Sequence, residues 1–398
     1  MISERILIIC FSISIFFACS PSSSVVELNV TNNLDKDRKS ETIEVDLKQL
    51  PKLLSKFSPE QIVIKDGNND QILLSQLIDL NGDKIPDQLI FQSDFQPNEH
   101  KHFHIEGIEG KLELPKSKIS TYARFVPERI DDFAWENDKV AFRTYGPEAQ
   151  AITESGKPGG TLSSGIDCWL KRVDYPIIDK WYKQDLEEGK SYHKDHGEGL
   201  DNYHVGPSRG TGGIGIWKDG TLSTSKNYES WKIIANGPIR TIFELNYGSW
   251  DADGLNVKEI KQISIDLGTN LFKNTLLLGN YSELPNITLG ITLHDKAGEV
   301  LTDVEQGWFR YLEPHDGSEL STAIVVDPSI IKEFIDHRVD EQDLSNLLIV
   351  CEQAPEVTYY AGFAWKKSNQ FKLPGGFDTY LSDFADRIAS PVVVEVVE

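Results

Sequence analysis

Positive charge, methionine and long hydrophobic runs are scarce in this chain, and each shortage limits what the protein can be. Its 398 residues include 40 Lys and Arg against 62 Asp and Glu, a formal net charge of −22. Because no basic stripe occurs, we expect no binding to nucleic acid. The single Met contrasts with eight Trp and 13 Tyr, a composition typical of secreted β-proteins that present aromatic surfaces to sugars. An anionic ligand must therefore be held by a few placed Arg or Lys side chains.

The amino-terminal segment indicates export. An apolar run extends from Ile6 to Ala18, and no later apolar stretch is long enough to span a bilayer. The run suits the core of a signal peptide, and Ala18 before Cys19 is the pattern of a bacterial lipoprotein signal. We predict a signal peptide over 1–18, lipidation of Cys19, a polar tether over 19–41 and an outer-membrane location, facing the periplasm or the cell surface. The alternative is an ordinary signal peptide with a chance Cys; membrane contact is expected only through the lipid anchor.

The exported chain has two cysteines besides Cys19. Cys168 and Cys351 both lie in apolar, strand-like runs. An oxidising compartment allows a disulfide between them, and two buried free thiols are the other possibility. The sequence leaves both open.

Hydrophobic periodicity predicts an all-β fold in two parts. Short alternating segments with Gly, Asn and Asp turns predict a small β-sandwich domain over 42–112. Many further strands at regular spacing predict a large antiparallel sandwich over 113–398, the catalytic domain. Few helices are expected, with SIIKEFIDHRV over 329–339 and TYLSDFADRIA over 379–389 as the two candidates.

A short acidic loop in the small domain resembles a calcium site. The segment DLNGDKIPDQL places oxygen side chains at Asp79, Asn81, Asp83 and Asp87. Hard Ca²⁺ is bound by such carboxylate and amide oxygens, so we predict structural calcium there. Ile90 occupies the position where an EF-hand has Glu, and the alternative is an Asx-rich hairpin turn. Both interpretations are structural, and whether the enzyme needs a catalytic metal stays open.

The segment YHKDHGEGLDNYHVGPSRGTGGIG, from Tyr192 to Gly215, holds three of the nine His. One interpretation is a Zn²⁺ site built from H-x-x-H and a distant third His. A second is acid–base chemistry, with His193 or His204 as base and Tyr192 or Tyr203 as acid. Solvated loop histidines are the third. The candidate catalytic residues are Tyr192, His193, His196, Tyr203 and His204.

A second segment, ARFVPERIDDFAWENDKVAFRTYGP from Ala123 to Pro147, mixes Arg and acidic residues with aromatic ones. Arg forks bind carboxylate or sulfate through two hydrogen bonds, and aromatic rings stack on sugars. We therefore predict a cleft wall, with buried ion pairs at a sandwich edge as the alternative. The candidate substrate-binding residues are Arg129, Trp135, Arg143, Tyr145 and, from the preceding segment, Arg209.

Other catalytic motifs are absent, or they occur where the surrounding sequence does not suit the motif. G-x-S-x-G, H-E-x-x-H and Walker loops do not occur. The G-x-G-x-x-G match at Gly210–Gly215 precedes IWKDGTL, which indicates a strand and a turn, so we reject dinucleotide binding. His294, His315 and His337 are isolated in the sequence. Paired carboxylates are plentiful, so a glycosidase dyad stays open.

Several long motifs resemble one bacterial family. FVPERIDDFAWENDKVAFRTYGP, SGIDCWLKR, YPIIDKWY, YHKDHGEGLDNYHVGPSRGTGG, ANGPIRTIFEL and TYYAGFAWKK are similar to those of a domain of unknown function, number 4861, in lipoproteins and secreted proteins of polysaccharide-degrading bacteria. The resemblance covers nearly all of the exported chain. It implies that the large domain is a β-supersandwich like that of mutarotases and many polysaccharide lyases.

Some members of this family resemble dehydratases that act on the uronic-acid end of ulvan-type oligosaccharides. Such an enzyme removes the C5 proton of the non-reducing-end uronate and expels the C4 hydroxyl. It needs a base, an acid and a cation for the carboxylate, and the two segments contain imidazole, phenol and guanidinium groups. The resemblance thus implies an acidic oligosaccharide substrate. The alternatives are a polysaccharide lyase, a glycoside hydrolase, an aldose epimerase or a non-catalytic glycan-binding lipoprotein.

Overall fold

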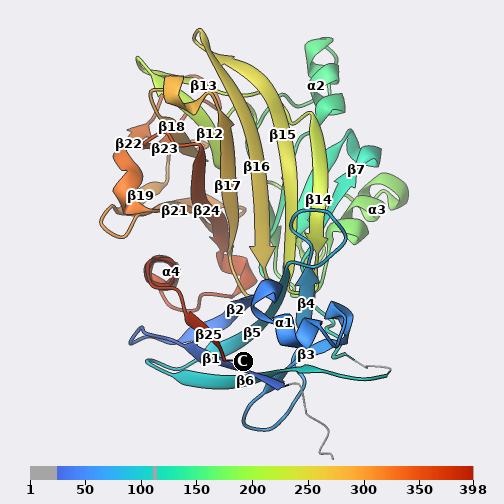
Figure 1. The fold of residues 1–398 in the computed structure, drawn as a ribbon. Helices are drawn as coiled ribbons and strands as arrows, with labels where there is room; N and C mark the ends of the chain where they lie inside the picture. The colour runs from blue at the N-terminus through green and yellow to red at the C-terminus, as the bar shows by residue number, and fades with distance from the viewer. Residues whose placement is uncertain (1–24, 111–113, 398) are drawn as a thin grey trace, which may run out of the picture.

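The computed structural model describes residues 25–110 and 114–397, and these form a small and a large β-domain (Figure 1). Strand pairs are antiparallel in every sheet. The prediction of an all-β fold with a small sandwich before a large one is confirmed. Within the described residues, no helix is long and apolar enough to cross a membrane. The predicted signal peptide and Cys19 lie outside the described residues.

The small domain is a sandwich of two sheets. One sheet has the order β25-β1-β6-β3, with β25 at Val393–Val397, β1 at Val25–Thr31, β6 at His100–Gly107 and β3 at Ile62–Asp66. The other has the order β2-β5-β4, at Arg38–Asp46, Gln88–Phe95 and Ser75–Ile78, and the short helix α1 spans Pro51–Leu54. Alternate residues of the strands point inward, as in β1, where Val26, Leu28 and Val30 are buried and the residues between them are not. They build one apolar core between the sheets.

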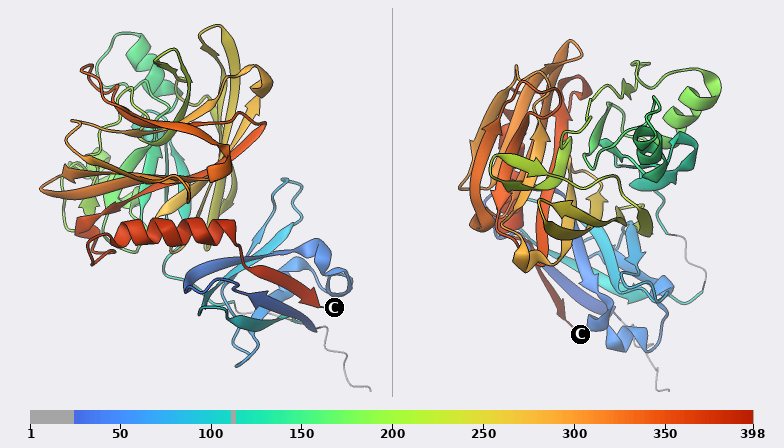
Figure 2. Two further views of the ribbon diagram at one scale, coloured as in Figure 1. Left: turned by 90° about the vertical axis from the view of Figure 1, so that its left-hand side faces the viewer. Right: turned by 90° about the horizontal axis from the view of Figure 1, so that it is seen from above.

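Two predicted boundaries of the small domain are wrong. β1 lies inside the segment expected to be a loose tether over 19–41, because Val26, Leu28 and Val30 alternate into the core. β25 comes from the far end of the chain and pairs with β1 from Val393 to Val397. The small domain therefore contains the first and the last described strands, as the left view of Figure 2 shows.

The large domain places two five-stranded sheets opposite one eight-stranded sheet (Figure 1). The eight strands, in spatial order, are β14 at Ser230–Asn236, β15 at Arg240–Ala252, β16 at Leu255–Asp266, β17 at Leu271–Gly279, β24 at Glu356–Trp365, β21 at Ser318–Val326, β20 at Trp308–His315 and β19 at Glu299–Asp303. One five-stranded sheet orders β13 at Thr221–Ser223, β12 at Thr211–Lys218, β18 at Ile287–Thr292, β23 at Asn346–Cys351 and β22 at Ile331–His337. The other orders β11 at Gly199–Leu200, β10 at Asp167–Lys171, β9 at Ala141–Thr144, β8 at Asp132–Glu136 and β7 at Tyr122–Val126. A single large apolar core draws side chains from all three sheets.

Three helices accompany the large domain: α2 at Pro147–Glu154, α3 at Ile178–Glu188 and α4 at Gly376–Ala389. α4 confirms the helix predicted over 379–389. The helix predicted over 329–339 is wrong, since this segment forms the edge strand β22, paired with β23. Its hydrophobic residues Ile331, Phe334 and Ile335 fit a helix face locally, but strand pairing decides the outcome.

The two domains are fastened together by apolar and ionic contacts. Ile78 and Ile90 of the small domain pack with Ile239 and Ile242 of the large one. Helix α4 lies between the domains (Figure 2, left), where Asp383 and Asp386 pair with Lys36 of the small domain. The two sandwiches are thus joined by a packed interface.

Both described cysteines are free and buried. Cys168 Sγ lies 3.0 Å from Thr211 Oγ1, and Cys351 Sγ lies 3.8 Å from the carbonyl oxygen of Ile349. Burial raises the pKa of both thiols, that of Cys351 to about 12. Of the two possibilities left open by the sequence, buried thiols are therefore the one observed.

Candidate active site

An open pocket of about 540 Å³ lies at the edge of the β7–β11 sheet, and most of the predicted site residues border it. Its size is within the range of small-molecule sites. The loop after β11 supplies one wall, and the segment after α2 supplies another. The lining side chains that carry chemistry are Arg129, Arg143, Tyr145, His193, Asp201, Asn202, Tyr203 and His204.

Arg143, on β9, is the centre of a buried ionic cluster under this pocket. Its Nε and Nη2 donate to Asp167 Oδ2 at 3.1 and 2.6 Å, and Nη2 also donates to Asp201 Oδ2 at 2.9 Å. Its Nη1 donates to Asp132 Oδ2 at 3.3 Å and to the Tyr192 hydroxyl at 3.2 Å. A guanidinium has five N–H donors, and five are engaged here. Arg143 therefore organises the pocket floor and has no donor left for a substrate.

The cluster holds more negative than positive charge. Three buried carboxylates, those of Asp132, Asp167 and Asp201, face Arg143 and the nearby Arg129. Burial raises the pKa of Asp201 well above its usual range, and Asp167 raises it further while Arg143 opposes the rise. Burial likewise raises the pKa of Asp132. We therefore expect this group of carboxyls to retain a proton at a pH where exposed carboxyls have lost theirs.

Arg129 is the guanidinium best placed to grip a substrate anion. It ends a 3₁₀ turn over Pro127–Arg129, and its Nε donates to the Tyr192 hydroxyl at 3.2 Å. Within residues 25–110 and 114–397, neither Nη atom has a hydrogen-bond partner, and neither is buried. The free fork borders the pocket, so it can receive a carboxylate through two parallel hydrogen bonds.

His193 is held in a defined orientation. Its Nδ1 lies 2.6 Å from the backbone carbonyl oxygen of Asp201 and 3.7 Å from the Asp201 carboxylate. A carbonyl only accepts, so the proton resides on Nδ1 and leaves Nε2 as a proton acceptor. The His193 side chain is 55% exposed and borders the pocket, so Nε2 is accessible to a substrate. This is the arrangement of a general base with an orienting partner.

Tyr192 is buried beneath the pocket lining, and its hydroxyl touches the two guanidinium groups that border the pocket. Its ring is buried against Trp169 and Tyr182, and its oxygen accepts hydrogen bonds from Arg129 and Arg143. Burial raises the pKa of Tyr192, although both guanidinium groups oppose that rise. The phenol therefore keeps its proton at neutral pH. Because its oxygen already accepts two hydrogen bonds, its O–H is available to donate.

The remaining residues of the His-containing loop divide between pocket and interior. His204 borders the pocket, with Nε2 3.0 Å from Asp343 Oδ2. Tyr203 also borders it, but its hydroxyl points inward and accepts from Thr211 Oγ1 at 3.2 Å. His196 lies outside the pocket lining, with Nε2 3.1 Å from the Ser191 carbonyl oxygen. The structure thus brings His193 and His204 together and leaves His196 apart.

Two of the predicted substrate-binding residues are buried away from the pocket. Trp135 has no exposed surface and packs in the main core against Phe142, Phe243 and Phe272. Arg209 is 1% exposed, and its guanidinium donates to Ser164 Oγ and two backbone carbonyls. Burial lowers the pKa of Arg209 to about 10. The prediction that these two residues contact substrate is wrong, because strand β8 turns Trp135 into the sandwich core and the loop before β12 buries Arg209.

Replacing Trp135 by Ala is therefore expected to affect stability. Large-to-small changes of buried aromatic residues cost about 3–5 kcal/mol. We expect the free energy of unfolding in urea to fall by that order, with substrate affinity of the folded fraction unchanged. A loss of substrate affinity with no loss of stability would contradict this prediction and would mean that Trp135 contacts the substrate. Val140→Ala in the same core provides a smaller volume change for comparison.

Two histidines isolated in the sequence, His294 and His315, support the loop of the pocket from behind. His294 Nδ1 lies 2.6 Å from Glu313 Oε1, and its Nε2 lies 2.9 Å from the backbone carbonyl oxygen of His204. His315 Nε2 lies 2.9 Å from Asn202 Oδ1. These residues lie about 100 positions away in the chain, and only strand pairing reveals that they support the 202–204 loop.

The acidic loop of the small domain satisfies its own backbone. Asp79 accepts from the amides of Gly82 and Lys84 at 2.7 and 2.8 Å, and Asp87 accepts from that of Leu80 at 2.8 Å. No group of three or more His, Cys, Asp or Glu suited to a metal ion occurs in the part of the chain that the structure describes. Calcium binding by this loop, with Asn81 and Asp83, stays a prediction.

Comparison with solved structures defines the class of fold. A protein in glycosyl hydrolase family 38 from Enterococcus faecalis superimposes with a TM-score of 0.51 at 9% identity, over 94% of this chain and 48% of that one. An alpha-mannosidase from Enterococcus faecalis V583 gives a TM-score of 0.48 at 9% identity, over 95% and 46%. This chain spans about half the length of both proteins. The first likeness shows a shared fold, which in this chain is an all-β sandwich.

Comparison of sequences identifies the family. A family model described as "Domain of unknown function (DUF4861)" matches residues 30–394. "Uncharacterized protein P7" of Formosa agariphila is 42% identical over 386 residues, which are 96% of each chain. The protein therefore belongs to the family of domain of unknown function 4861, as its motifs predicted.

Proposed function

We propose that the protein is a carbohydrate-active dehydratase, which removes water from the non-reducing-end uronic acid of an ulvan-type oligosaccharide. One observation supports this most. Arg129, with a free guanidinium fork, and His193, with Nε2 unengaged, both border the pocket, and the Tyr192 phenol lies just beneath its lining, hydrogen-bonded to Arg129 Nε. Carboxylate clamp, base and acid are the three groups that such an elimination requires.

The proposed reaction follows from this arrangement. Arg129 binds the uronate carboxylate and stabilises the charge that develops when C5 loses its proton. His193 Nε2 accepts that proton. Tyr192 donates its O–H to the C4 oxygen, the C4–O bond breaks, and water leaves as a 4,5-double bond forms. The proton on His193 then returns to the Tyr192 oxygen through solvent, which restores the starting state.

Of two rival activities, a glycosidase fits the geometry less well, and a polysaccharide lyase fits it as well as the dehydratase does. A glycosidase needs two carboxyl groups facing the scissile bond, but Asp132 and Asp167 lie beneath the pocket lining and only Asp201 borders it. A polysaccharide lyase uses the same base and clamp with a sugar as leaving group, so it is the second candidate. The glycosyl hydrolase likeness of the fold supports a carbohydrate substrate but no reaction type.

Mass spectrometry of the products separates these reactions. Uronate-ended oligosaccharides, both saturated and unsaturated, are incubated with the protein while enoate absorbance is recorded. A product lighter by one water, at unchanged chain length and with new absorbance, is the expected result. Shorter chains with absorbance indicate a lyase, and shorter chains without it a hydrolase. Binding with no change of mass contradicts catalysis and supports a glycan-binding lipoprotein.

Arg129→Ala is expected to reduce kcat/KM about 10–100-fold, because a hydrogen bond to a charged group contributes about 1.5–3 kcal/mol. Arg129→Lys keeps the charge without the fork and is expected to lie between Ala and wild type. The control is Arg172→Ala, which removes an exposed Arg that pairs with Asp195 outside the pocket. Equal kinetics for the Arg129 and Arg172 variants would exclude Arg129 as the clamp.

A further inference from the structure

A row of unpartnered polar groups crosses the eight-stranded sheet far from the histidine pocket. Strand register places Ser264 of β16 opposite Lys273 of β17, and Lys273 opposite Tyr360 of β24. Their neighbours Ile263 and Ile265 point into the core, so the row lies on the outer face of the sheet. Hydroxyl, ammonium and phenol thus stand side by side on adjacent strands.

None of these three groups is used by the fold. Among the described residues, Lys273 Nζ has no carboxylate within 4.0 Å and no hydrogen bond, and the Ser264 and Tyr360 hydroxyls also lack protein partners. Neither hydroxyl is among the buried unpartnered atoms, so both are accessible. Burial raises the pKa of Tyr360, so its phenol stays a hydrogen-bond donor.

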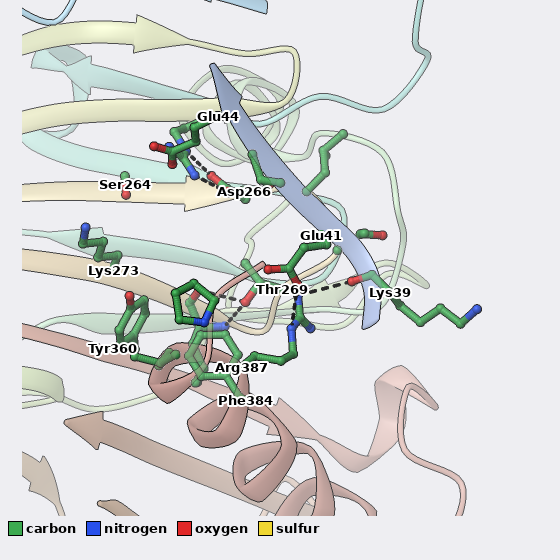
Figure 3. Close-up of a pocket in the computed structure, with 18 of the residues that line it drawn as sticks. Lys39, Glu41, Glu44, Ser264, Asp266, Thr269, Lys273, Tyr360, Phe384 and Arg387 are labelled. Atoms are coloured by element: carbon green, nitrogen blue, oxygen red, sulfur yellow. Dashed lines mark hydrogen bonds and ion pairs between the residues drawn. The ribbon is translucent and has the colours of Figure 1, made fainter. Parts of the chain in front are cut away.

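The row forms one wall of a pocket of about 330 Å³ between the two domains. Figure 3 shows Ser264, Lys273 and Tyr360 on the sheet side, with Phe384 and Arg387 of helix α4 facing the same space. Strand β2 supplies a further wall. The Phe384 ring packs edge-on against Tyr360, with centroids 5.1 Å apart and planes at 77°. A ligand here therefore meets polar and aromatic side chains together.

The other charges in this pocket are already paired. Arg240 binds Asp266 through Nε and Nη2 at 2.6 and 2.7 Å, and its Nη1 lies 2.5 Å from Glu44. Arg387 Nη2 lies 2.6 Å from Glu41. Lys273 is thus the lining cation left over after pairing. On a chain of net charge −22, an uncompensated cation in a pocket marks a place for an anionic group.

We propose that this junction pocket is a second saccharide-binding site, which holds one acidic sugar residue of an oligosaccharide without acting on it. Lys273 binds the sugar's carboxylate or sulfate, and Ser264 and Tyr360 bind hydroxyl groups on either side. Phe384 and the Tyr360 ring cover an apolar face of the sugar. The pocket volume, near the small end of ligand sites, suits a single residue of a chain that continues into solvent. This inference does not depend on the proposed dehydratase activity.

Binding is tested in a background that silences the histidine pocket. The double variant Arg129→Ala, His193→Ala is titrated calorimetrically with a galacturonate hexamer, a heparin hexasaccharide and neutral cellohexaose. We expect at least one acidic hexamer to bind and cellohexaose not to bind. Adding Lys273→Ala is expected to weaken binding about tenfold or more, through loss of a charge-assisted hydrogen bond.

The matched control is Lys258→Ala. Lys258 is exposed on β16, the strand of Ser264, six residues before it and opposite Gly279 at the other end of the sheet. It removes an equal charge without touching the junction pocket, so binding is expected to stay within twofold of the background variant.

Three outcomes would overturn this inference. They are no binding of either acidic hexamer, equal effects of the Lys273 and Lys258 changes, and displacement of the hexamer by inorganic sulfate at equal concentration, which would make the pocket a simple anion site. If the protein binds the hexamer in a way that depends on Lys273 but does not turn over any substrate, only the proposed dehydratase activity is contradicted. The two proposals are therefore separable.

Discussion

Replacing His193 by Ala is expected to lower kcat by a factor of about 10²–10⁴, the usual contribution of a general base. The change removes the Nε2 that accepts the C5 proton and leaves the carboxylate clamp intact. Since Arg129 still binds the uronate, KM is expected to change little. Product formation is followed by enoate absorbance and by mass spectrometry on a uronate-ended oligosaccharide.

His196→Ala is the control for this experiment. His196 lies on the same loop three residues later, but its Nε2 meets only the Ser191 carbonyl oxygen, away from the pocket. Its removal is expected to leave kcat within about twofold. Full turnover by the His193 variant, with loss of turnover in His204→Ala, would transfer the role of base to the imidazole paired with Asp343.

Replacing Arg143 by Met is expected to have the largest effect on stability. Removing one partner from a buried ionic cluster costs about 3–5 kcal/mol, because uncompensated charge remains buried. Here three carboxylates, those of Asp132, Asp167 and Asp201, lose their shared cation. We expect the free energy of unfolding in urea to drop by that amount at neutral pH, and turnover to fall because the pocket floor loosens.

The pH dependence of this loss has a definite sign. The Asp132 and Asp201 pKa values are raised in the folded protein, so folding takes up protons and stability falls as pH rises from the unfolded value, about 3.9, through the folded values. Removing Arg143 raises those folded values further. The difference between wild type and variant is therefore expected to be larger at pH 7 than at pH 4.5. A pH-independent difference would mean that lost packing, rather than lost charge, causes the destabilisation.

Much of the fold can be predicted from local pattern, because strand alternation is a local property. The segment ETIEVDLK alternates and forms the end of β2, whose Ile43 and Val45 point into the core. Pairing between distant strands is not local, and it produced the errors. The hydrophobic spacing of the segment over 329–339 suits a helix, but the segment pairs with the free edge of β23 and forms strand β22. β25 has a clear strand composition, and only tertiary contact reveals that its partner is β1.

The candidate site divides in the same way. Residue types and their clustering were enough to select the loop of His193 and His204 and the segment of Arg129 and Arg143. The sequence could not show which Arg has hydrogen-bond donors free for a substrate. The three acidic residues that occupy the donors of Arg143 come from three different strands or loops. Trp135 was misassigned because the sequence shows an aromatic residue among charges, and only the sheet determines which face it takes.

The pairing of β1 with β25 has a consequence for biosynthesis. A ribosome releases the chain from its amino terminus, so β1, β3 and β6 emerge early and must wait, with an unfilled sheet edge, while nearly 300 further residues are translated. Domains usually fold in the order of their synthesis. Of the two described domains, the small one begins first and is completed last, and an unpaired strand edge is a template for association with another chain. Export of the unfolded chain, as the predicted signal peptide would direct, would remove this waiting period, because both ends of the sheet would then be present together.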